Sequence, residues 1–207
     1  MSGAFAPAGD RILTASLDHT ARLWCLDASG ATCVATLPHP AAVIAAAFSP
    51  DGGELVTGGE DGVVRWFDRD ARATREFRAH EEWIWSVAFS PSGDRVVTAS
   101  RDCSARVFDR RGRRLATLPH EKTVASAAFS PDGSRIVTAC TDGCARVFAS
   151  DGSLELKLSG HAAMVWCAAF DASGEWVVTG SYDGTARVWP VTRAGLLGLA
   201  ERLQSAR

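Results

Sequence analysis

The chain has 207 residues, of which 46% are hydrophobic and 22% charged, and its formal net charge is −2. This length allows one or two domains with a sizeable core, and the hydrophobic fraction excludes an intrinsically disordered chain. The near-neutral charge gives no overall reason to expect a nucleic acid or an anionic membrane as partner, and no stretch approaches the roughly 20 apolar residues of a membrane span. The first ten residues lack the features of a secretory signal, and six cysteines without a CxxC pair indicate reduced thiols in a cytoplasmic protein.

One pattern recurs five times along the chain. A phenylalanine followed by a turn sequence stands at Phe5, Phe48, Phe89, Phe129 and Phe170. Aspartates recur in the same phase at Asp18, Asp61, Asp102, Asp142 and Asp183. Histidines keep the same step at His39, His80, His120 and His161. Each of the aspartates is followed four residues later by an arginine and six residues later by an aromatic residue. So many positions in one phase indicate a tandem array of about 40-residue units.

The predicted elements within each unit are short β-strands. In the fourth unit they cover residues 124–129, 135–139, 145–148 and 154–158. Turn sequences at 130–133 and 141–143 separate the first three of them. Glycine and proline recur too often to leave room for the helices of a helical solenoid. Four short strands in about 40 residues are typical of a β-propeller blade, so the predicted fold class is all-β.

At these residues the chain resembles the WD40 repeat family, over roughly residues 3–190. The fifth repeat carries the closest match, with Gly160-His161, Ser181-Tyr182-Asp183-Gly184 and Trp189. The resemblance implies that His161, Ser181, Asp183 and Trp189 form a buried, hydrogen-bonded tetrad that stiffens the blade. Repeats two to four have phenylalanine in place of the tryptophan, and Gly59 and Cys140 replace the serine in repeats two and four.

The same resemblance assigns structural roles to the other recurring polar residues. These positions are His39, His80, His120, Asp18, Asp61, Asp102 and Asp142. No nucleophile elbow, phosphate-binding loop or HExxH motif is present. We therefore expect no catalytic residue, no metal site and no cofactor.

The blades of the family have four antiparallel strands, A to D from the axis outward, and five blades are predicted within residues 1–191. Blade one (1–37) lacks strand A apart from its last residues, and blades two (38–78), three (79–118) and four (119–158) are complete. Blade five (159–191) lacks strand D. These missing strands predict an open arc or a strained five-blade ring, with self-association through the incomplete terminal blades.

Residues 192–207 are predicted to form a short amphipathic helix, because apolar residues follow a helical spacing from Leu196 to Leu203. This helix either caps the apolar edge of blade five or binds a partner. The tail resembles those that follow WD40 arrays in large bacterial signalling ATPases and protease-like proteins, so the chain is similar to the C-terminal part of a bacterial-type array.

Positions that vary between the repeats are candidates for partner binding, because a scaffold position must be alike in every blade. They are the residue before each recurring aspartate and the third residue after each recurring histidine, and the resemblance places both on one loop face. The candidates are Trp83, Arg101, Met164, Tyr182 and Glu60, with Trp85 and Trp166 two residues further into strand A. Several are of types enriched at binding hot spots. The alternative is that they are unconstrained loop residues.

The predicted function is a non-catalytic scaffold that binds a protein or a peptide through this loop face. Two alternatives remain open. The chain is a truncated fragment of a larger bacterial signalling protein without independent activity, or it is a propeller hydrolase with chemistry built from loop residues at the axis.

Overall fold

The computed structural model describes residues 2–196, and in this range nineteen β-strands form five antiparallel sheets. Blade one contains β1 (Gly3–Phe5), β2 (Arg11–Ala15), β3 (Thr20–Asp27) and β4 (Gly30–Pro38). Blade two contains β5 (Val43–Phe48), β6 (Glu54–Gly59), β7 (Val63–Asp68) and β8 (Ala73–Arg78). Blade three contains β9 (Ile84–Phe89), β10 (Arg95–Ser100), β11 (Ser104–Asp109) and β12 (Arg114–Pro119).

The remaining strands belong to the last two blades. Blade four contains β13 (Val124–Phe129), β14 (Arg135–Cys140), β15 (Cys144–Ala149) and β16 (Leu154–Ser159). Blade five contains only β17 (Val165–Phe170), β18 (Trp176–Ser181) and β19 (Ala186–Pro190). Consecutive strands pair within every sheet, so each blade is a simple meander.

Short polar turns set the strand boundaries, as the turn between β13 and β14 illustrates. The Oγ of Ser130 donates to Asp132 at 2.5 Å and accepts from the backbone N–H of Arg135 at 2.9 Å. Gly133 completes the turn with a φ of 70°, which glycine adopts at low cost. The equivalent serines of blades two and three accept the same backbone bond.

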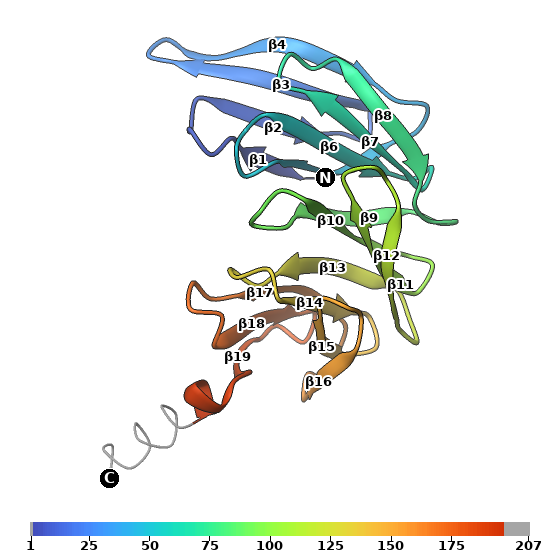
Figure 1. The fold of residues 1–207 in the computed structure, drawn as a ribbon, viewed down its shortest axis with the longest axis vertical. Helices are drawn as coiled ribbons and strands as arrows, with labels where there is room; N and C mark the ends of the chain where they lie inside the picture. Colours follow the sequence, from blue (N-terminus) through green and yellow to red (C-terminus); the bar gives the residue numbers. More distant parts are fainter. Residues whose placement is uncertain (1, 197–207) are drawn as a thin grey trace.

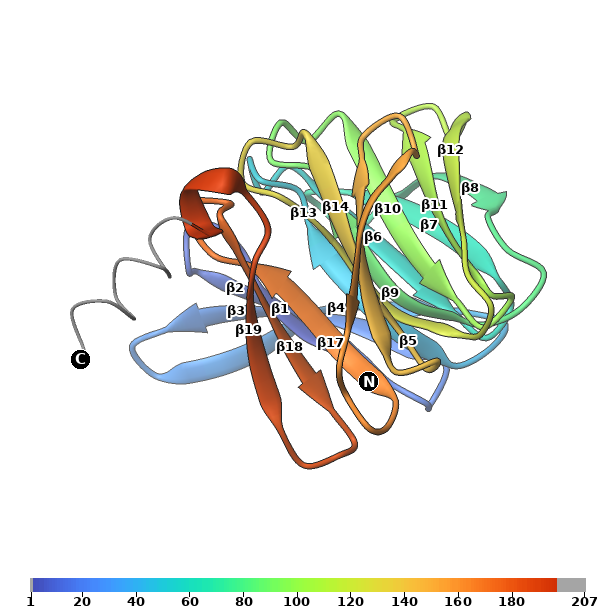
Figure 2. The same ribbon diagram turned by 90° about the horizontal axis from the view of Figure 1, so that it is seen from below.

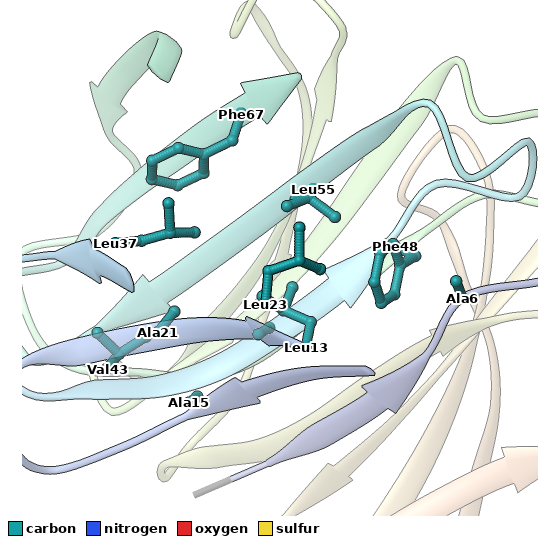
Figure 3. Close-up of a cluster of buried hydrophobic side chains, with 11 residues drawn as sticks. Ala6, Leu13, Ala15, Ala21, Leu23, Leu37, Val43, Phe48, Leu55 and Phe67 are labelled. Atoms are coloured by element: carbon teal, nitrogen blue, oxygen red, sulfur yellow. The ribbon is translucent and has the colours of Figure 1, made fainter. Parts of the chain in front are cut away.

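The blades follow one another in chain order, as Figures 1 and 2 show, and their first strands β5, β9, β13 and β17 contact one another in sequence. Four apolar clusters each join one blade to the next. Figure 3 shows the cluster between blades one and two, where Leu13 and Leu23 of blade one meet Leu55 and Phe67 of blade two. The core is therefore divided into interfaces between neighbouring sheets. In Figure 1 the first and last blades lie toward opposite ends of the molecule.

At the start of the array, blade one contains three residues of strand A, because Gly3, Ala4 and Phe5 pair with β2. After β19 the chain turns back instead of forming a strand D, and residues 193–196 begin a helix. Val191 packs into the cluster between blades four and five. The rest of the predicted helix lies outside the described residues.

Within the described residues, the helical segment is too short to cross a membrane.

Candidate functional site

Four aromatic side chains from blades three and five form a continuous row, which we call the aromatic ladder. Trp83 and Trp85 have ring centroids 5.7 Å apart, and the centroid of Trp85 lies 5.6 Å from that of Trp166. The ring of Trp166 in turn meets Tyr182 edge-on, with centroids 5.6 Å apart. These separations are within the range of favourable aromatic pairs. The ladder thus unites four of the seven residues predicted to bind a partner.

The ladder reaches from blade three to blade five across the intervening blade. Trp85 and Trp166 occupy the same position in their strands, four residues before the recurring phenylalanine. The equivalent residue of blade four is Ala125, whose small side chain is buried. The first strands of the three blades are in contact, and the side chain of Ala125 is only a methyl group. The indoles of Trp85 and Trp166 can therefore reach each other across blade four. A large residue at position 125 would separate the two tryptophans.

The two sets of variable positions are neighbours in each of blades two to five. The residue before the recurring aspartate donates its backbone N–H to the carbonyl of the third residue after the recurring histidine. The pairs are Glu60 with Ala42, Arg101 with Trp83, Thr141 with Thr123, and Tyr182 with Met164, at 3.0 Å in each case. One backbone hydrogen bond therefore places both variable side chains of a blade side by side on the loop face.

Arg101 and Met164 adjoin the ladder through these bonds. The guanidinium carbon of Arg101 lies 5.4 Å from the ring centroid of Trp83, in a cation–π arrangement. Met164 is 41% exposed beside Tyr182. Glu60 differs, because it belongs to blade two and pairs with Ala42. These contacts link six of the seven predicted residues, whereas Glu60 pairs within blade two.

Exposure increases along the ladder toward blade five. Trp83 and Trp85 are half-buried, whereas Trp166 is 41% and Tyr182 66% exposed. The indole N–H of Trp85 is buried and has no acceptor among the described residues. The blade-five end thus offers the larger contact area to a partner.

The predicted tetrad of blade five is present with one correction. His161 Nδ1 donates to the carboxylate of Asp183 at 2.8 Å, and its Nε2 lies 2.8 Å from the hydroxyl of Thr179. The same hydroxyl accepts the indole N–H of Trp189 at 2.9 Å. Thr179, not Ser181, therefore connects the histidine to the tryptophan. The hydroxyl of Ser181 instead bonds backbone groups of the neighbouring turn.

The threonine has a counterpart in every blade, and the sequence contained the signal that would have found it. Threonine stands nine residues after each recurring phenylalanine, at Thr14, Thr57, Thr98, Thr138 and Thr179. The histidines of blades two, three and four bond Thr57, Thr98 and Thr138 through Nε2, at 2.7 to 2.9 Å. In blade one, Trp24 donates to Thr14 at 3.0 Å. In every blade the hydroxyl of this threonine therefore bonds the recurring histidine, the third-strand tryptophan or both, and we call it the threonine junction.

The recurring histidines and aspartates form hydrogen bonds within their own blades, and these contacts and burial shift the pKa values of several of them. Burial lowers the pKa of His120 to about 4, and burial also lowers the pKa of His80 although the hydrogen bond to Asp102 opposes the shift. Burial works to raise the pKa of Asp102, but hydrogen bonds from His80 and Ser104 outweigh it and hold this pKa below its usual range. Burial raises the pKa of Cys140 to about 11, which makes its thiol a poor nucleophile.

Within residues 2–196, the structure brings together no group of three or more metal-ligating side chains. His80, Asp102 and Ser104 lie within hydrogen-bond reach of one another, but Asp102 and Ser104 both contact Nδ1 of the imidazole, unlike the partners in a catalytic triad, and the histidine is fully buried. A substrate cannot reach its imidazole without unfolding the blade. These groups therefore serve the stability of the blade.

A comparison with known protein families accounts for the repeats. The model of the WD domain, G-beta repeat, matches residues 1–25, 31–68, 72–109, 112–148 and 152–190. Each match after the first runs from the outer strand of one sheet through the third strand of the next, so the sequence repeat and the blade are offset by one strand. The matches cover most of the chain, and the chain therefore belongs to the WD40 repeat family.

Proposed function

We propose that this chain is a non-catalytic scaffold that binds a protein or a peptide through the aromatic ladder and the adjoining Arg101 and Met164. Repeats of the WD40 family generally mediate protein–protein interaction. The observation that carries the proposal is the contact between Trp85 and Trp166 across blade four, which joins residues of blades three and five into one apolar surface. The proposal includes a cytoplasmic location, which is supported by six cysteines that are all free.

The composition of this surface favours a protein partner. Tryptophan, tyrosine and arginine dominate binding hot spots, and the two aromatic residues bury a large area while losing little conformational freedom. Trp166 and Tyr182 expose their rings, and Arg101 adds an exposed positive charge at the blade-three end. A peptide with an apolar side chain for the ladder and an acidic residue for Arg101 would complement both features.

We infer that the chain has no catalytic role because its recurring histidines and aspartates already bond other groups of the scaffold. The histidines of blades two to five all bond a threonine of their own blade, and the aspartates bond histidine, arginine or the turn backbone. A screen for hydrolase activity, with and without divalent metals, is expected to show no turnover. Turnover abolished by replacing a residue of the ladder would contradict the scaffold.

Selection from a displayed peptide library on the purified chain, followed by calorimetry with the selected peptide, tests the binding face. Replacing Trp166 or Tyr182 by alanine should weaken the complex by about 30-fold each, the effect of a hot-spot residue worth about 2 kcal/mol. Leu115→Ala is the matched control, because Leu115 is 45% exposed on the outer strand β12, near the end of the strand that pairs with Phe108 and not near the end that pairs with Ser104 beside the loop face. Selected peptides that bind the Trp166 and Tyr182 variants at full strength would rule out the ladder as the binding site.

A further inference from the structure

The two faces of each blade carry different side chains and meet different neighbours. We call the face turned to the next blade in the chain the forward face, and the opposite one the rear face. The forward faces of blades one to four bury two large apolar side chains each, on their second and third strands. These pairs are Leu13 and Leu23, Val56 and Trp66, Val97 and Val107, and Val137 and Val147, none of them more than 2% exposed.

The forward face of blade five has the same side chains without the neighbour. Val178 and Val188 stand at the positions of these pairs, and they are 45% and 66% exposed. Ala186 is exposed as well, whereas its counterparts in the other blades are fully buried. An apolar surface that is buried at four equivalent places and open at the fifth is an interface without its partner among the described residues.

The rear face of blade one is the complementary half of such an interface. The rear faces of the later blades offer an aliphatic residue on the second strand and an aromatic residue on the third. The pairs are Leu55 and Phe67, Val96 and Phe108, Ile136 and Phe148, and Val177 and Trp189. Blade one has Ile12 and Trp24 at these positions, and no described blade precedes it. Trp24 of blade one and Trp189 of blade five are both tryptophans, whereas the other three blades have phenylalanine at this position.

We propose that the forward face of blade five binds the rear face of blade one of a second copy of this chain. The contact would bring Val178 and Val188 of one copy against Ile12 and Trp24 of the other. It would thus repeat, between chains, the composition and the strand order of the four interfaces within the chain. This continuity with the internal interfaces identifies the second copy as the occupant.

The polar groups at the edge of these interfaces are consistent with this contact. Arg95 and Arg135 donate to backbone carbonyls of the following blade, at Gly133 and Gly174 respectively. The same position in blade five is occupied by Trp176, which is half-buried. Packing against a second copy would therefore bury an apolar side chain at that point and would leave no charge unpaired.

The proposed contact is head-to-tail, because it joins two different surfaces. A pair of copies then retains one free forward face and one free rear face. Association continues to longer assemblies with rising concentration unless the ends meet in a ring. This property separates the proposal from a symmetric dimer, in which each copy would use the same surface.

Analytical ultracentrifugation of the full chain over a range of concentrations tests the proposal. The wild type is expected to show a mass that increases with concentration. Val188→Asp should yield a monomer, because an aspartate cannot be buried in an apolar interface without a partner. Leu115→Asp is the matched control, since it places the same charge on an exposed leucine away from both end faces, and it should assemble like the wild type.

A mixture of two variants provides the sharper test. Ile12→Asp blocks only the rear face and Val188→Asp only the forward face, so each variant alone is monomeric. Mixed in equal amounts, they should form a one-to-one pair that does not grow, because each supplies the face the other lacks. If Ile12→Asp does not fold, as judged by circular dichroism, Ile12→Ser takes its place.

Three results would overturn the proposal. The first is a wild type that stays monomeric at its highest soluble concentration. The second is an assembly that Val188→Asp leaves intact. The third is a mixture of the two variants that remains monomeric. None of these results bears on the aromatic ladder, whose test uses peptide binding.

Discussion

Blades four and five have a histidine, a threonine and an aspartate at the same positions and connect them differently. In blade five, His161 donates to Asp183, and Trp189 shares the threonine hydroxyl. In blade four, His120 Nδ1 donates to the backbone carbonyl of Leu118 at 3.0 Å. The aspartate of blade four instead pairs with Arg146, with a nitrogen–oxygen distance of 2.5 Å.

Two neighbouring residues account for this difference. Pro119 precedes the histidine of blade four, and its fixed φ favours a turn in which the imidazole reaches back to the carbonyl two residues earlier. Gly160 holds the same place in blade five. Two residues after the aspartate, Thr185 of blade five donates to Asp183 at 2.6 Å, whereas blade four has Cys144 there. The hydroxyl helps to hold the carboxylate beside the histidine.

Blade two has the arrangement of blade four, and blade three has that of blade five. In blade two, where a proline precedes it, His39 bonds the carbonyl of Leu37. In blade three, His80 follows an alanine and bonds Asp102, which also accepts from Ser104. The repeat therefore tolerates two networks, and the residues that select between them lie outside the recurring set.

The largest expected effect comes from removing the aspartate of blade four. The side chains of Asp142 and Arg146 are only 8% and 6% exposed, so Asp142→Ala leaves a buried guanidinium without its partner. We expect a loss of about 3 kcal/mol in the free energy of unfolding, measured by urea denaturation. Asp18→Ala is the control, because its pair with Arg22 is 44% and 41% exposed, and it should change stability little. Equal losses would show that burial does not set the strength of these pairs.

The next effect is a dependence of stability on pH that originates in blade four. The pKa of His120 is lowered to about 4 in the folded chain, against an ordinary value of 6.5. The unfolded chain therefore takes up the proton first, and stability is lost as the pH falls from about 6.5 toward 4. The expected loss from this histidine is about 3 kcal/mol at pH 4. In His120→Gln, thermal unfolding should depend less steeply on pH across this window, and an unchanged slope would contradict the assignment.

The threonine junction should matter more in blade five than in blade four. Both Thr179→Val and Thr138→Val remove a hydroxyl that donates to a backbone carbonyl and bonds a histidine. Thr179→Val also leaves the indole N–H of Trp189 without its partner. We expect the first variant to be less stable than the second by about 1 kcal/mol, the net value of one hydrogen bond. Chemical denaturation of both variants measures the difference, and a larger loss in blade four would reverse our account of the two networks.

The smallest effect concerns the turn after the aspartate. Blade four has Gly143 there, whereas blade three has Cys103 with a φ of 63°, which is unfavourable for a residue with a side chain. Cys103→Gly should raise the melting temperature slightly, because relief of this strain exceeds the added entropy of the unfolded chain by less than about 1 kcal/mol. The reverse change Gly143→Cys should lower it. A stabilising Gly143→Cys would show that the turn does not require this conformation.

Much of the fold could be predicted from the recurring positions, and part of the site could not. The phase of the aspartates and phenylalanines placed the strands, because hairpin turns between short apolar runs are local features. Ser181 was assigned to the tetrad through the family pattern, and the structure gives that role to Thr179. The recurrence of the threonine is visible in the sequence. A single hydroxyl residue in a strand does not, however, indicate locally that it will bond a buried histidine or tryptophan.

The sequence by itself determined the repeat and the strand order, since these follow from turns and periodicity within 40 residues. The tertiary structure alone decided that Trp85 and Trp166 meet across blade four and that Val178 and Val188 remain open. Both results depend on how neighbouring blades stack. That stacking is a property of packing between sheets, and it is set by side chains that are far apart in the chain.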